Sequence, residues 1–282
     1  MIDTWVVLLI LFGVSLLISA IGFKKFVWFL SVGYGLSILG CGLTLLIMYF
    51  ILGHMNITGL IACILLMVYG FRLGGFLLFR ELKTKSYQKT LNEVTKTEKP
   101  IPVFVKITVW IVCAALYMAQ AAGIMFLLQY RYRYQTGFLD TNVLEIIGVS
   151  IMALGIFIEA LADHQKSVSK KIDATKPAMN GLYKICRCPN YYGEILMWTG
   201  VFVFFFACLL GGFNVNWWKY VLVSIAYISI IYIMLNGAKR LEGRQAKNYG
   251  ELEEFKEYTK KTPLIIVVFI PIKSLINSKI IK

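Results

Sequence analysis

The chain has 282 residues, of which 59% are hydrophobic and only 16% are charged, and its mean hydropathy is +0.71. A water-soluble domain is about half apolar and about one quarter charged, so the composition excludes an ordinary soluble enzyme and indicates that most of the chain lies in a bilayer. The net charge of +14 is distributed over alternate loops, which favours contact with anionic membrane lipid and does not indicate a nucleic-acid partner.

Seven apolar runs are each long enough to cross about 30 Å of hydrocarbon as a helix. They cover residues 4–22, 27–52, 57–79, 103–130, 141–162, 194–212 and 216–236. No basic region precedes the first run, and Lys24 and Lys25 follow it instead, so we interpret it as a retained span and not as a signal peptide. The predicted fold class is an all-α integral membrane protein, a bundle of about seven transmembrane helices.

Basic residues follow the first, third and fifth runs and recur in the tail. The positive-inside rule assigns these loops to the cytoplasm, so the N-terminus is expected outside and the C-terminus inside. Arg131 and Arg133 fall in an outside loop and count against this orientation. The chain divides into a three-span region (1–80), a basic cytoplasmic loop (81–102) and a four-span domain with a tail (103–282).

The tail after the last run is mostly polar over residues 237–262, with apolar positions at helix-like spacing. This pattern predicts one or two amphipathic helices at the cytoplasmic face. Residues 263–271 are too short to span and are expected to pack back on the bundle. Cys186 and Cys188 have no second cysteine pair and the chain has only two histidines, so no metal site is predicted.

Ionisable residues enter the fifth run at its cytoplasmic end. Glu159 and Asp163 are four residues apart and share one helix face, and Gln165 and Lys166 follow. Ionisable side chains on a membrane helix usually face a cavity or a partner, which suggests a functional role. Solvation of a helix end is the alternative, and it is weaker for Glu159, which lies one turn deeper.

A second polar group, which includes Arg187, Asn190, Tyr191 and Glu194, leads into the sixth run. Asn190 can cap the helix, whose N-terminal N–H groups suit anions, and an arginine can bind phosphate with two parallel hydrogen bonds. Gly193 allows another group to approach closely. The alternative is an ordinary helix cap with an arginine that reaches the membrane surface.

The third run contains Tyr69 and Arg72, three residues apart on one helix face. A buried tyrosine hydroxyl near an arginine can act as a proton donor. An anchor pair at the membrane boundary is an equal alternative.

Together these groups resemble the DUF1295 proteins, a family similar to the C-terminal domain of steroid 5-alpha-reductases. The resemblance covers roughly residues 65 to 271 and rests on the following residues in order: Arg72-Leu73-Gly74 with Arg80 in the third run, Glu159-x-x-x-Asp163-x-Gln165-Lys166, Gly181-Leu182-Tyr183, Arg187-x-Pro189-Asn190-Tyr191-Tyr192-Gly193-Glu194, Trp198-x-Gly200, Glu242, Tyr258-x-x-x-Thr262 and Pro271.

This resemblance implies a seven-helix bundle that binds NADPH from the cytoplasmic side and takes its substrate from the lipid. Steroid reductases of this kind reduce a carbon–carbon double bond conjugated to a ketone. Tyr69 matches the tyrosine that holds the carbonyl and is the expected catalytic residue. The expected cofactor-binding residues are Arg72, Glu159, Asp163, Gln165, Lys166, Arg187, Asn190, Tyr191, Glu194, Glu242 and Tyr258.

Two positions depart from the pattern. Cys188 stands where the family usually has histidine. The steroid reductases also pair their tyrosine with a glutamate on an earlier span, and this chain has no acidic residue between Asp3 and Glu81. The substrate is therefore left open as a steroid-like enone or a fatty-acyl or isoprenoid lipid.

Two other functions fit the same residues. The Arg-x-Pro-x-Tyr opening at Arg187 and the tail with glutamate, tyrosine and proline are also similar to the isoprenylcysteine carboxyl methyltransferases. That resemblance implies S-adenosylmethionine as the cofactor. A non-catalytic lipid-binding membrane protein is the third hypothesis, and it predicts that no nucleotide binds.

Overall fold

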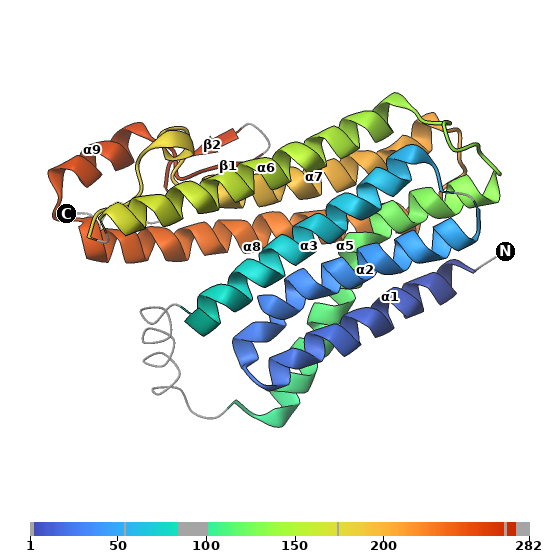
Figure 1. The fold of residues 1–282 in the computed structure, drawn as a ribbon, viewed down its shortest axis with the longest axis horizontal. Coiled ribbons are helices and arrows are strands. Elements are labelled where there is room, and N and C mark those ends of the chain that lie inside the picture. The colour runs from blue at the N-terminus through green and yellow to red at the C-terminus, as the bar shows by residue number, and fades with distance from the viewer. Residues whose placement is uncertain (1–2, 54, 84–100, 174, 268–269, 275–282) are drawn as a thin grey trace. The chain divides into compact units, whose positions relative to one another are not determined.

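A computed structural model describes residues 3–53, 55–83, 101–173, 175–267 and 270–274. Most of the predicted 81–102 loop lies outside these residues. The elements in chain order are α1 (Thr4–Ser19), η1 (Ala20–Phe23), η2 (Phe26–Phe29), α2 (Val32–Ile51), α3 (Ile57–Lys83), α5 (Val103–Arg133), α6 (Val143–Ile172), η3 (Gly181–Lys184), α7 (Pro189–Leu210), α8 (Trp217–Tyr249), α9 (Glu253–Lys261), β1 (Ile265–Val267) and β2 (Ile270–Ile272) (Figure 1).

Among the residues that the structure describes, seven helical segments are long and apolar enough to cross a membrane, so the fold is that of an all-helical integral membrane protein, as predicted. They cover Thr4–Phe23, Phe26–Ile51, Ile57–Phe79, Val103–Arg133, Val143–Ile172, Pro189–Leu210 and Trp217–Tyr249. Among the described residues, β1 and β2 are the strands that accompany these helices.

Three helix ends differ from the predicted runs. Helices α6 and α8 continue to Ile172 and Tyr249, well past the predicted ends at 162 and 236. Lysine, glutamate and alanine are good helix formers, so both helices continue after the apolar residues stop. Helix α7 begins at Pro189, ahead of the predicted start at 194, because proline suits the first helical position. Helix α8 therefore contains the first half of the predicted amphipathic tail, and α9 is the second.

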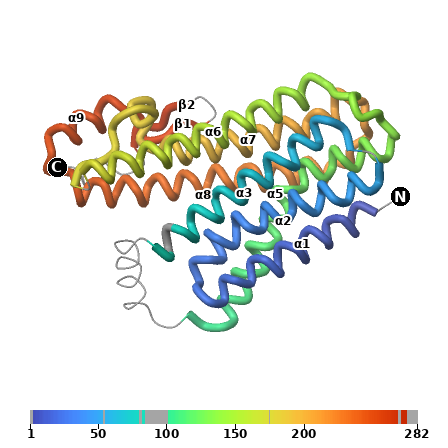
Figure 2. The backbone as a smooth tube through the Cα atoms, viewed as in Figure 1, coloured from blue at the N-terminus to red at the C-terminus, as the bar shows by residue number. Residues whose placement is uncertain are grey.

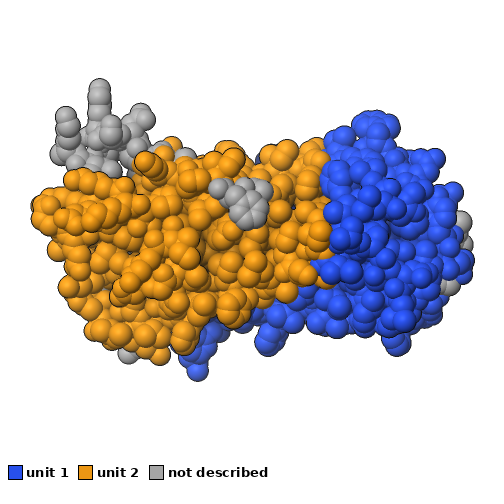
Figure 3. Space-filling view, turned by 90° about the horizontal axis from the view of Figure 1, so that it is seen from above, with its two compact units in different colours: residues 1–146, 204–223 blue, residues 147–203, 224–282 orange. Residues whose placement is uncertain are grey.

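The chain forms two compact units, which Figure 3 colours separately. Unit 1 contains residues 1–146 and 204–223, and unit 2 contains residues 147–203 and 224–282. The division into a three-span region, a loop and a four-span domain stays a prediction.

In unit 1, α2 and α3 pack with their backbones in contact (Figure 2). A Cβ added to Gly35 would lie 2.5 Å from the nitrogen of Gly74, and one added to Gly70 would lie 2.4 Å from the carbonyl oxygen of Gly35. Small residues permit such close approach of membrane helices. Helices α1 and α5 also pack against α2.

A buried polar cluster surrounds Glu145 in unit 1. It lies next to the turn between α2 and α3. The Glu145 carboxylate accepts hydrogen bonds from Asn56 Nδ2 at 2.7 Å and Thr58 Oγ1 at 2.5 Å, and it forms an ion pair with the buried Arg131. Arg131 counted against the predicted orientation, but its charge is balanced inside the fold. The orientation of the bundle itself stays a prediction.

In unit 2, α6 and α7 also cross at glycines. A Cβ added to Gly155 would lie 2.3 Å from the nitrogen of Met197, and one added to Gly193 would lie 2.6 Å from the nitrogen of Glu159. The group that Gly193 admits is therefore the backbone of α6. Helix α8 contacts α7 through a 2.8 Å hydrogen bond between the Tyr227 and Thr199 hydroxyls.

The C-terminal segment folds back on unit 2 as a short antiparallel hairpin, in which Ile265 of β1 lies opposite Ile272 of β2. Leu264 and Ile265 are fully buried. The Arg187 amide donates a 2.9 Å hydrogen bond to the Pro263 carbonyl, which joins the hairpin to the loop before α7.

Candidate functional site

The predicted site residues fall in both units. Tyr69 and Arg72 lie on α3 in unit 1. All the others lie in unit 2, where they come from five segments: Glu159, Asp163, Gln165 and Lys166 on α6, Arg187 before α7, Asn190, Tyr191 and Glu194 on α7, Glu242 on α8 and Tyr258 on α9.

Arg187 lies at the centre of the unit 2 group. Its guanidinium is buried and donates to the Glu242 carboxylate at 3.2 Å and to the Lys273 carbonyl at 2.6 Å. Ser274 donates to the same Glu242 oxygen at 2.8 Å. The Nε of Arg187 has no hydrogen-bond partner among the described residues. A buried charged group with an unused donor is uncommon, and this edge of the guanidinium could accept an anionic ligand.

Gln165 holds the turn before η3. Its side-chain oxygen accepts a 2.9 Å hydrogen bond from the Leu182 amide. Gly181 precedes this amide with φ +64°, and a Cβ there would lie 2.5 Å from the Gln165 oxygen, so only glycine fits comfortably. The predicted cofactor role of Gln165 stays a prediction, and its oxygen is already used inside the protein.

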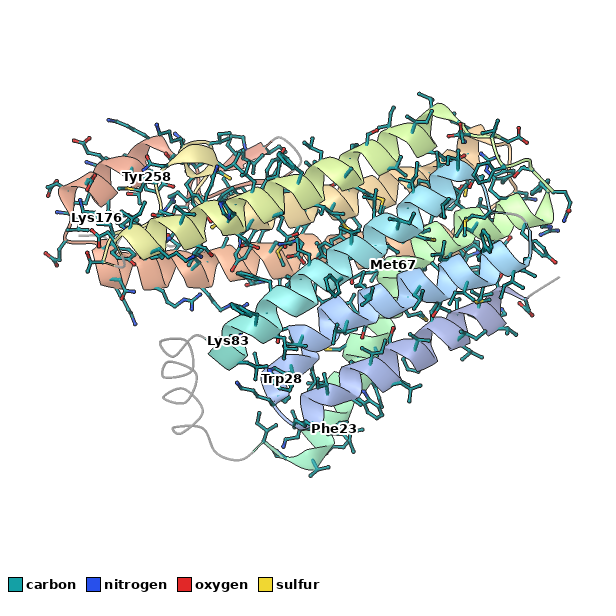
Figure 4. All side chains as sticks on the ribbon, in the orientation of Figure 1. Phe23, Trp28, Met67, Lys83, Lys176 and Tyr258 are labelled. Carbon is teal, nitrogen blue, oxygen red and sulfur yellow. The ribbon has the colours of Figure 1, made fainter. Side chains whose placement is uncertain are left out.

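Tyr258, labelled in Figure 4, lies on α9 and links this helix to η3. Its hydroxyl donates a 2.6 Å hydrogen bond to the Tyr183 carbonyl. Burial raises the pKa of the Tyr183 hydroxyl well above its usual value, and the Asp163 carboxylate adds to this rise. Asp163 therefore lies within electrostatic reach of the turn that Tyr258 supports.

Cys186 and Cys188 are buried on either side of Arg187. Burial raises the pKa of Cys186 to about 11 and that of Cys188 to about 12. The positive charges of Lys166 and Arg187 act in the opposite direction on Cys188, which places Lys166 near this thiol. The Cys188 thiol is therefore neutral and buried at physiological pH.

Two buried carboxylates, one on α6 and one on α7, lie where these helices cross. Glu159 and Glu194 are 3% and 6% exposed, and the backbone of Glu159 lies against Gly193, next to Glu194. Ionised carboxylates so far from water require partners. Asn190 is half-buried in the first turn of α7.

Two arginines of α8, which we did not predict, also belong to this group. The charges of Arg240 and Arg244 act on the Tyr191 hydroxyl, and the Tyr191 ring lies against Gly237, where an added Cβ would be 3.2 Å from it. The sequence signal was their spacing of four residues, which puts both arginines on one helix face. They bring positive charge to the start of α7.

Tyr69 is fully buried in unit 1, and its hydroxyl lies 2.9 Å from that of Tyr34 on α2. We did not predict Tyr34. Both spans contain a Tyr-Gly dipeptide, Tyr34-Gly35 and Tyr69-Gly70, and the glycines meet at the α2–α3 crossing. That repeated dipeptide was the signal that could have identified the pair. Arg72 is half-buried one turn further along α3.

A family model for DUF1295, described as a protein of unknown function, matches residues 23–262. The chain therefore belongs to the DUF1295 family, which confirms the resemblance. Comparison with curated proteins and with solved structures gave no match.

Proposed function

We propose that this DUF1295 membrane protein is an NADPH-dependent reductase that saturates a conjugated carbon–carbon double bond in a hydrophobic, steroid-like or lipid substrate. The main support is Arg187, a buried cation whose Nε has no partner among the described residues. It lies two residues before Pro189, where α7 begins, and the N-terminal end of a helix favours anions.

The residues of unit 2 fit the chemistry of a dinucleotide. Phosphate groups need cationic and N–H donors, and Arg187, Lys166, Arg240 and Arg244 would supply them with the first amides of α7. Carboxylates such as Glu194 suit the hydroxyl groups of a ribose. When bound, NADPH supplies a hydride to the substrate.

The substrate-binding residues in this proposal belong to unit 1. Tyr69 donates a hydrogen bond to the substrate carbonyl and stabilises the negative charge that develops on its oxygen during reduction. A hydrophobic substrate can enter from the bilayer, since the helices are apolar. We further propose that the cofactor end faces the cytoplasm, in a bacterial inner membrane or the endoplasmic reticulum.

Thermal unfolding of the purified protein in detergent or nanodiscs tests the cofactor. A ligand that binds only the folded state stabilises it by about 2.7 kcal/mol at 100 times its Kd, so NADPH should raise the Tm. Lys166→Gln should weaken this shift. Lys171→Gln changes an exposed lysine on the same helix and should leave the shift unchanged.

Other outcomes of this experiment separate the alternatives. A shift with S-adenosylmethionine and none with NADPH would replace the reductase with a methyltransferase. No shift with either ligand, in a sample that is monodisperse and melts cooperatively, would favour a lipid-binding protein. Equal NADPH shifts for Lys166→Gln and Lys171→Gln would remove the unit 2 group as the binding site.

A further inference from the structure

Three buried tyrosines from three helices meet inside unit 1. The Tyr34 and Tyr69 hydroxyls lie 2.9 Å apart, and the Tyr34 ring lies 5.2 Å from that of Tyr117 on α5. Their side chains are 8%, 0% and 3% exposed. The Tyr117 hydroxyl donates to the Phe29 carbonyl at 2.5 Å, where η2 ends, so it has a structural role. Tyr34 and Tyr69 bond to each other.

The Tyr34–Tyr69 pair has the properties of a strong hydrogen-bond donor. Each phenol has one O–H donor and can also accept. A hydroxyl that accepts a hydrogen bond from its neighbour becomes a stronger donor itself, and a low local dielectric increases this effect. Tyr34 can therefore enhance the donor strength of Tyr69 without a carboxylate.

Gln120 is a second unusual polar group in this unit. It lies on α5, one helical turn or about 4.5 Å along the axis from Tyr117, and is 3% exposed. Neither its amide nitrogen nor its amide oxygen has a hydrogen-bond partner among the described residues. Buried polar side-chain atoms are nearly always bonded, so an amide with neither atom bonded indicates a position that a ligand completes.

We propose that Tyr34, Tyr69 and Gln120 form the binding site for the oxygen-bearing end of the substrate, an enone with a hydrophobic body. Tyr69 donates to the enone carbonyl, Tyr34 acts through Tyr69 as a positioning residue, and Gln120 contacts a polar group of the ligand. This inference rests on the proposed reductase function. It assigns to Tyr34 the place that a glutamate has in the steroid reductases.

The reaction balances when bound NADPH supplies the hydride and is converted to NADP+. The hydride adds to the β-carbon of the enone, and the π-electron pair of the carbon–carbon bond moves so that negative charge develops on the carbonyl oxygen. Tyr69 stabilises that oxygen through its O–H bond. A proton from water then adds to the α-carbon, and the saturated ketone leaves.

Binding without cofactor tests this site separately from the reductase. The probes are progesterone and a long-chain alkenyl methyl ketone, added to protein in nanodiscs without NADPH. The Kd comes from titration, and the ultraviolet band of the bound enone reports the hydrogen bond to its carbonyl. We expect at least one probe to bind and its band to shift to longer wavelength.

Tyr34→Phe keeps the ring and removes the hydroxyl. It should weaken binding by up to about tenfold, because Tyr69 becomes a weaker donor to the enone carbonyl, and reduce the shift of the enone band. Tyr117→Phe is the matched control. It removes the bond to Phe29, so it should lower the Tm and leave the Kd of the probe unchanged.

For Gln120→Leu we expect the opposite of the Tyr117→Phe result, namely weaker probe binding without a loss of Tm. Replacing an unbonded buried amide with an apolar group of similar size should maintain or raise the Tm, while probe binding weakens about tenfold. A lower Tm would show that Gln120 has a structural partner, and this would overturn its assignment to the ligand site.

The outcomes distinguish this inference from the proposed function. If neither probe binds the wild-type protein, or if Tyr34→Phe and Gln120→Leu both leave the Kd unchanged, the site is wrong even where NADPH raises the Tm. If probe binding responds to both variants and NADPH gives no shift, the site stands as an enone-binding site and the reductase function falls.

Discussion

The Arg187 guanidinium and the Glu242 carboxylate form an ion pair at 3.2 Å, and both side chains are almost completely buried. The pair joins the loop before α7 to α8, and Ser274 adds a hydrogen bond from the tail. Desolvation of two charges is unfavourable unless the geometry and further hydrogen bonds compensate. These contacts keep a cation in a fixed position inside unit 2.

Glu242→Gln should therefore destabilise the protein strongly. It leaves Arg187 buried without a counter-charge, and the loss of one partner of a buried pair costs about 3–5 kcal/mol. Denaturant unfolding in mixed micelles measures the change. Glu257→Gln breaks an exposed pair with Lys261 and serves as the control, for which we expect no measurable effect. Equal stability of the two variants would contradict the structural role of the Arg187–Glu242 pair.

Gly155→Ala should lower the Tm, because the added Cβ would lie 2.3 Å from the backbone nitrogen of Met197 and would force α6 and α7 apart. Gly13→Ala in α1 is the matched control, since a Cβ there has nothing within 4 Å. Alanine is intrinsically the better helix former by about 1 kcal/mol. The control should thus be as stable as the wild type or more so. If the Tm of both variants changed in the same direction, this would contradict a tight crossing of α6 and α7.

The two loop cysteines predict how stability depends on pH. In the folded protein burial raises the pKa of Cys186 to about 11 and that of Cys188 to about 12, from an ordinary value of 9.0. Above pH 9 the unfolded chain loses these protons first, so it binds fewer protons than the folded state. The free energy of unfolding then falls as pH rises. The thiols contribute their full stabilisation below pH 9.

A Cys186→Ala, Cys188→Ala double variant tests this prediction. Its Tm should fall less steeply than that of the wild type when the pH is raised from 9 towards 11, and the two curves should run parallel below pH 9. Native protein should also react slowly with a thiol reagent at neutral pH and rapidly after denaturation. Fast labelling of Cys188 in the native state would show that the loop is open.

Tyr258→Phe should separate a structural role from a cofactor role. The Tyr258 hydroxyl donates to the Tyr183 carbonyl, and loss of one such bond lowers stability by about 1 kcal/mol. We expect a lower Tm with an unchanged NADPH affinity, measured by titration of the cofactor fluorescence. A marked loss of affinity at unchanged Tm would instead support the predicted cofactor contact.

Much of the fold could be predicted because the length of an apolar run is itself a physical requirement for crossing a bilayer. The ends of α6 and α8 could not, since both helices continue through polar residues that are good helix formers. The ion-pair partner of Arg131 could not be predicted for a different reason. Its partner Glu145 is separated from it by a turn, and only the fold brings the two together.

The candidate site was predictable in part. The polar residues of α6 and α7 were identified because ionisable groups are rare in membrane helices. Tyr34 was missed because we looked for an acidic partner of Tyr69, and an aromatic residue in an apolar run resembles packing. Gln165 and Tyr258 bond to backbone atoms, which a list of polar residues cannot reveal.

The contacts of Arg187 also set an order of assembly during synthesis. Its partners Glu242, Pro263 and Lys273 all follow it in the chain. When α6 and α7 have left the ribosome, the guanidinium has none of these three partners, and it acquires them only after α8 and the hairpin have been made. The loop before α7 is thus completed after the membrane helices, and a chain that stops before Glu242 on α8 would insert with the Arg187 charge uncompensated.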